Sequence, residues 1–107
     1  MSIESINEEF LPKFLEIGPD KFFRFLIIYA LNKLIYIAKD KNKYKGVSPE
    51  IEFINYYDQF IILYRRNGEQ HHLDLARIFR RAGHKIYWTM LRKEMINRND
   101  KFLNLVN

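Results

Sequence analysis

The stretch FFRFLIIYALNKLIYIA, residues 22–38 of the 107-residue chain, limits the folds available because so many apolar side chains must leave water. Arg24, Asn32 and Lys33 interrupt it, and its longest uninterrupted apolar piece has only seven residues. A membrane-spanning helix needs about 20 predominantly apolar residues, so the sequence predicts a buried helix and no membrane span. Pro19 fits the first position of such a helix, which we expect over residues 19–39.

The expected helix 19–39 is apolar on nearly every side. At 100° per residue, only Arg24, Asn32 and Lys39 share a polar sector, and Ile28 and Ile35 lie inside that sector. A helix that is apolar all round is buried on most sides, and one sheet with two further helices is too little to cover it. We therefore expect a homodimer formed through helix 19–39.

The segments on either side predict shorter elements. Before this helix we expect two short helical turns, over residues 6–11 and 12–17, because Pro12 separates them and Gly18 ends the second. After it, EIEFINYY and FIILYRR are rich in β-branched and aromatic residues, which favours two strands joined at Asp58-Gln59.

Asn67-Gly68 then predicts a second hairpin turn, with a short third strand over residues 69–72. The alternative starts the last helix directly after Gly68. The expected fold class is α+β in a single domain, residues 1–107. It would combine short N-terminal helical turns, a long buried helix, an antiparallel two- or three-stranded β-hairpin or meander and a long C-terminal amphipathic helix.

The C-terminal helix is expected over residues 75–96. Its apolar side chains fall on one half of the helix, and a stripe on the other half has helical spacing: Arg77, Arg81, His84, Lys85, Trp88 and Arg92. Gly83 costs a helix interior about 1 kcal/mol relative to Ala. A split at Gly83 would make residues 75–93 resemble a helix-turn-helix, although the glycine is not where that motif usually places its turn.

The charge is unevenly distributed along the chain, which carries a net charge of +5. Residues 1–20 have a net charge of −4 and the remainder +9. A basic body favours anionic partners, and a tryptophan among arginines is typical of a protein interface or of a base-stacking surface. In another interpretation, Trp88 packs beneath the acidic N-terminal segment, which neutralises the arginines.

We therefore expect a small non-enzymatic adaptor or regulatory module that binds a macromolecular partner through the basic, Trp-containing face of helix 75–96. The alternative is a nucleic-acid-binding protein that uses the same face. The partner is then a protein, a second copy of the chain or a nucleic acid.

The sequence offers few groups for catalysis. Glu50 and Glu52 have the spacing of paired carboxylates on one strand face, but acids on an edge strand usually prevent aggregation instead. The chain has no Gly-rich phosphate loop and no nucleophile elbow, so we expect no enzymatic activity and no cofactor. The acidic N-terminus does not resemble a secretory signal, which predicts an intracellular, cytoplasmic protein.

Metal binding is not expected either. The chain has no cysteine, and the adjacent His71 and His72 would point to opposite faces of a strand. A site would need a further convergent donor such as Glu69 or Asp74.

Overall fold

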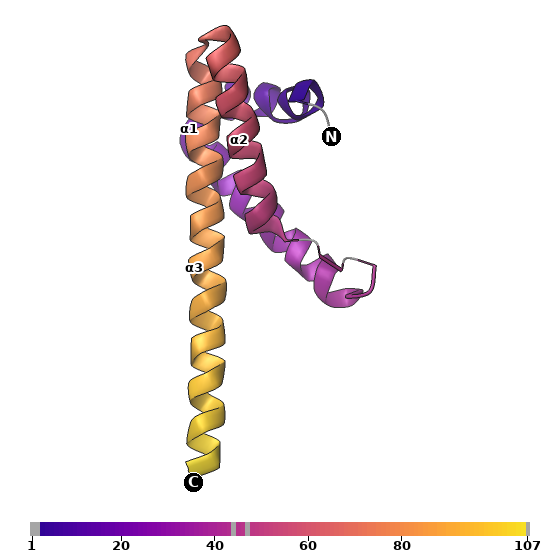
Figure 1. Cartoon of the computed structure of the whole chain (residues 1–107), viewed down its shortest axis with the longest axis vertical. Coiled ribbons are helices and arrows are strands. Elements are labelled where there is room, and N and C mark those ends of the chain that lie inside the picture. Colours follow the sequence, from indigo (N-terminus) through magenta and orange to yellow (C-terminus); the bar gives the residue numbers. More distant parts are fainter. Residues whose placement is uncertain (1–2, 44, 47, 107) are drawn as a thin grey trace.

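The computed structural model describes residues 3–43, 45–46 and 48–106, and this part of the chain forms three helices without any strand (Figure 1). Helix α1 spans Ile3–Lys39, α2 spans Pro49–Asn67 and α3 spans Gln70–Val106. The fold is therefore all-α, and the predicted α+β class with its β-hairpin is wrong.

Helix α1 is broken at Gly18, whose φ of 80° and ψ of 172° lie outside the helical region. The two segments, residues 3–17 and 19–39, consequently point in different directions (Figure 1). The break at Gly18 and the helix over residues 19–39 confirm the sequence prediction. The two short turns before it are wrong, since one helix runs through Pro12 and gives up a single backbone hydrogen bond there.

Helix α2 replaces the two predicted strands. Pro49 occupies its first turn, where the missing backbone N–H is not needed. Gly68 ends the helix in the left-handed conformation, with φ of 68°, and its N–H donates to the carbonyl oxygen of Tyr64 at 2.7 Å. The Asn67-Gly68 pair is thus a helix C-cap rather than a hairpin turn, and the predicted third strand is wrong as well.

The core consists largely of aromatic rings from all three helices, with Phe79 of α3 at its centre. The ring centroid of Phe79 lies 5.0 Å from that of Phe10, 5.4 Å from Phe53 and 5.6 Å from Phe60. All four side chains are fully buried. Phe53 and Phe60 are seven residues apart on one face of α2, so the β-branched and aromatic content of this segment belongs to an amphipathic helix.

Helix α3 is continuous across Gly83, so residues 75–93 do not form a helix-turn-helix. It begins at Gln70, close to the alternative that started it directly after Gly68. A Cβ added at Gly83 would lie 3.4 Å from the Cβ of Phe53 and 3.5 Å from the carbonyl oxygen of Glu50. The α3 backbone at Gly83 therefore packs against α2, at a separation that leaves ordinary van der Waals space for a Cβ.

The molecule is elongated, with extents of 60 × 27 × 23 Å. Helix α3 alone is about 55 Å long at 1.5 Å per residue, and its C-terminal part extends beyond α2 (Figure 1). None of the helices within the described residues is long and apolar enough to cross a membrane.

Candidate partner-binding surface

The six residues predicted to bind a partner are all exposed on α3. Because the helix is regular, they share a sector of about 100° around its axis. We call this set the basic face: Arg77, Arg81, His84, Lys85, Trp88 and Arg92. The opposite side of α3 contributes Leu75, Phe79 and Ala82 to the core, so the separation into a buried half and an exposed stripe is confirmed as far as Ile86. Beyond it, Tyr87 and Met90 of the predicted apolar half are exposed.

Trp88 is 59% exposed. Its ring packs edge-on against the exposed ring of Tyr87, with centroids 5.8 Å apart. The acidic N-terminal segment lies elsewhere, since Phe10 contacts Phe79 and Asn7 contacts His72. The interpretation that placed Trp88 beneath this segment is therefore wrong.

Three exposed arginines of α3 have no carboxylate partner among the described residues. Arg77, Arg80 and Arg81 line a shallow hollow of about 320 Å³ together with His84. The guanidinium of Arg81 lies 4.4 Å from the ring centroid of Phe23, and that of Arg80 lies 5.7 Å from the ring of Tyr57. These rings hold the side chains in place, and no carboxylate of the described residues lies within ion-pair distance of the three guanidiniums.

A second hollow of about 390 Å³ adjoins the basic face where Gly83 provides no side chain. Ile51 and Ile54 of α2 line it with Tyr87 and His84 of α3, and both isoleucines are exposed. The sequence prediction missed the two isoleucines because it assigned them to a strand. Gly83, on the apolar half of the expected helix, was the available signal that another helix approaches there.

Glu50 and Glu52 lie on α2 and not on an edge strand, so they do not share one face. Glu52 instead accepts a hydrogen bond of 2.7 Å from Lys33 of α1, and Glu50 lies elsewhere in the first turn of α2. Burial alone would lower the pKa of Lys33, but the hydrogen bond to Glu52 and the nearby Tyr29 raise it above its usual value. The carboxylate of Glu52 therefore links α1 to α2.

Tyr56 lies in the same α1–α2 contact. Burial raises the pKa of Tyr56 to about 12, and the negative charge of Glu52 adds to the effect. The neutral phenol is consequently part of the packed structure.

The histidines also lie differently from the prediction. His71 and His72 occupy the first turn of α3, with ring centroids 4.5 Å apart, instead of opposite faces of a strand. His72 is buried and stacks on Phe60. Burial is the main cause that lowers the pKa of His72 below its usual value, and the neighbouring His71 lowers it further. Glu69 opposes the shift. The lowered pKa favours the neutral imidazole of His72.

Comparisons of the chain with protein-family models, with curated proteins and with solved structures find no match.

Proposed function

We propose that the chain is a non-enzymatic adaptor or regulatory module that binds an acidic protein surface through the basic face of α3. The observation that carries the proposal is the exposure of Trp88 beside arginines that have no described carboxylate partner. Trp, Tyr and Arg are the residues that most often dominate the binding energy of protein interfaces.

The chemistry of the surface defines the partner that would fit. Carboxylates would face Arg77, Arg81 and Arg92, where a guanidinium favours planar, two-point hydrogen bonding. An apolar side chain would enter the hollow between Ile54 and Tyr87, next to the basic face. The mixture of basic, aromatic and apolar groups favours a protein partner over one recognised by charge alone.

Site-specific photo-crosslinking in cells tests the proposal. A photoreactive phenylalanine derivative replaces Lys85 on the basic face, and in a matched control it replaces Lys21, an exposed lysine on α1. We expect a discrete protein adduct from position 85 only, and the adduct should weaken when Arg77 and Arg81 are both replaced by Ala. The proposal is wrong if position 85 gives no adduct or if position 21 gives the same one.

Nucleic-acid binding is the second candidate function. It is favoured by the cluster of Arg77, Arg80 and Arg81 and by the exposed ring of Trp88, on which a base could stack. The same crosslinking experiment separates the two candidates. Adducts that nuclease removes, and whose yield falls steeply with salt because counterions are released, would favour nucleic acid.

We also propose that two copies associate through α1. Ile28 and Ile35 are 59% and 53% exposed, and Leu31 lies between them on the same side of the helix. Three large apolar residues at positions i, i+3 and i+7 form a stripe that a partner helix would cover. Ile28 and Ile35 are the two apolar residues that lie inside the polar sector of helix 19–39, the helix through which the sequence predicts a homodimer.

A further inference from the structure

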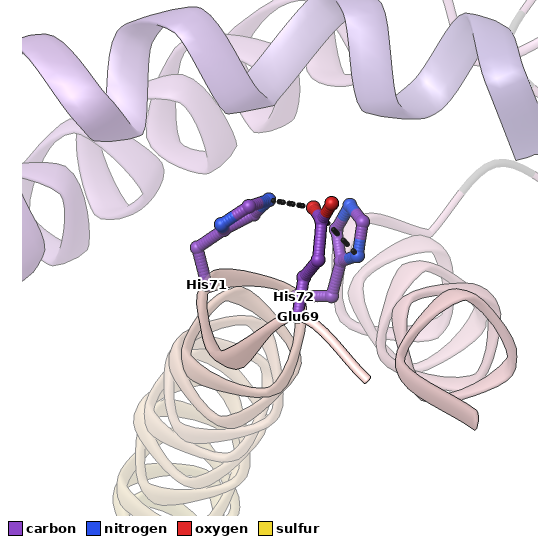
Figure 2. A group of neighbouring side chains, drawn as sticks. All are labelled: Glu69, His71 and His72. Atoms are coloured by element: carbon purple, nitrogen blue, oxygen red, sulfur yellow. Dashed lines mark ion pairs between the residues drawn. The ribbon is translucent and has the colours of Figure 1, made fainter. Parts of the chain in front are cut away.

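Three potential metal ligands meet where the α2–α3 connection enters α3. Glu69 directly precedes α3, and His71 and His72 lie in its first turn (Figure 2). One ligand atom of each residue lies within 4.8 Å of the others. His71 Nε2 is 2.7 Å from Glu69 Oε2, and His72 Nδ1 is 4.0 Å from the same oxygen.

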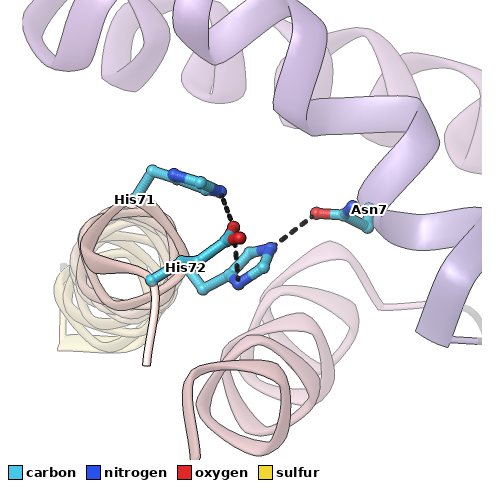
Figure 3. Close-up of polar contacts among 4 residues, drawn as sticks. Asn7, His71 and His72 are labelled. Atoms are coloured by element: carbon cyan, nitrogen blue, oxygen red, sulfur yellow. Dashed lines mark hydrogen bonds and ion pairs between the residues drawn. The ribbon is translucent and has the colours of Figure 1, made fainter. Parts of the chain in front are cut away.

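His72 is held in the tautomer that a metal requires. Its side chain is only 3% exposed, and its Nε2 lies 3.1 Å from Oδ1 of Asn7 on α1 (Figure 3). An amide oxygen only accepts hydrogen bonds, so Nε2 carries the proton and donates it to Asn7. The lone pair is therefore on Nδ1, the atom that faces Glu69. Metal-binding histidines are typically oriented by such a hydrogen bond from the second ring nitrogen.

Both facing nitrogens lack a hydrogen-bond partner. His72 Nδ1 and His71 Nε2 are buried atoms to which no described group of the chain makes an aligned hydrogen bond. His71 Nε2 approaches Glu69 at 2.7 Å, but the N–H direction is wrong for a hydrogen bond. A buried polar atom left without a partner costs about 1–3 kcal/mol, so the arrangement favours a further atom that accepts both lone pairs.

We propose that Glu69, His71 and His72 bind one divalent transition-metal ion, with Zn²⁺ as the best fit. Imidazole nitrogen and carboxylate oxygen are ligands that Zn²⁺ prefers. Tetrahedral bonds of about 2.0–2.1 Å place two ligand atoms about 3.3 Å apart. The separations of 2.7 and 4.0 Å lie on either side of this value, and the exposed Glu69 is free to adjust. The fourth position would take water or a donor from a partner.

The ion would stabilise the junction of all three helices. Glu69 fixes the end of the α2–α3 connection, His72 packs on Phe60 of α2, and its hydrogen bond to Asn7 reaches α1. The site is independent of the basic face, because none of its three ligands belongs to that face.

Calorimetric titration of the tag-free chain with Zn²⁺ tests the proposal. We expect saturable binding of one ion per chain, and Glu69→Gln and His71→Gln should each weaken it at least tenfold. Asn7→Ala should weaken it by about tenfold or more, because it removes the orienting hydrogen bond. His84→Gln is the matched control, an exposed histidine of the same helix outside the cluster, and should leave the affinity unchanged.

Nitrogen NMR of the unmodified chain gives a second readout that does not depend on any variant. Zn²⁺ should shift the resonance of His72 Nδ1 and leave Nε2 protonated. The proposal is overturned if no one-to-one binding is seen, if His84→Gln weakens binding as much as His71→Gln, or if the ring nitrogens of His72 do not respond to Zn²⁺.

Discussion

Replacing Gly83 by Ala should stabilise the protein. Gly83 lies inside a continuous helix, where Ala is favoured over Gly by about 0.5–1 kcal/mol. The added Cβ would meet Phe53 at 3.4 Å, Glu50 at 3.5 Å and Ile54 at 3.8 Å, all of which are ordinary van der Waals distances. We therefore expect a gain of about 0.5–1 kcal/mol in unfolding free energy, which raises Tm by roughly 4 °C for a chain of this size.

The prediction is checked by urea and thermal unfolding followed by circular dichroism. Gly83→Leu should lose about 1–3 kcal/mol, because its larger side chain overpacks the same contact. Gly18→Ala is a matched control in open space, where only the backbone matters. Its φ of 80° and ψ of 172° are accessible almost only to Gly, so the variant should lose about 1–3 kcal/mol. A destabilised Gly83→Ala would refute the claim that the space between α2 and α3 accommodates a Cβ at this position.

Two further predictions concern α1 and its contact with α2. The free energy of unfolding should fall as pH rises from 10 towards 12, because Tyr56 keeps its proton to about pH 12 in the folded chain but loses it near pH 10 when unfolded. Urea unfolding at several pH values should show a smaller decline for Tyr56→Phe, and an identical decline would exclude Tyr56 as its cause. The double variant Ile28→Glu, Ile35→Glu should give a folded monomer, because both side chains are exposed. Multi-angle light scattering measures the mass in solution, and an unmodified chain that is already monomeric would contradict the α1 interface.

The parts of the fold that could be predicted are those in which apolar or basic residues follow one clear helical pattern along the sequence. The helix over residues 19–39 follows from its apolar length and from Gly18-Pro19, but the predicted burial on most sides is wrong, since Ile28 and Ile35 are exposed. The stripe at 77, 81, 84, 88 and 92 follows from its helical spacing. Both are local patterns that the tertiary structure preserves.

Helix α2 was missed because β-propensity is weak evidence when it competes with helix-end signals. Pro49 at the start, acidic residues in the first turn, arginines in the last turn and Gly68 after the end all indicate a helix. Phe53 and Phe60 repeat at helical spacing, but the preference of isoleucine and tyrosine for strands concealed it. Burial against α3 outweighs that preference.

The surroundings of the candidate sites could not be predicted because they depend on which helices pack together. Ile54 lies beside Tyr87 only because α2 packs against α3 around Gly83. Similarly, the approach of Asn7 to His72 spans 65 positions along the sequence, so nothing local indicates the orientation of that imidazole.

Fluorescence quenching of Trp88, the only tryptophan of the chain, tests the central claim most directly. An exposed indole among the arginines of the basic face should be quenched readily by iodide and much less by caesium, because the basic face attracts the anion and repels the cation. The preference should shrink in urea, and also after Arg81 and Arg92 are replaced by Ala. Blue-shifted emission that resists both ions, or equal quenching by the two, would contradict an exposed, positively charged face on α3.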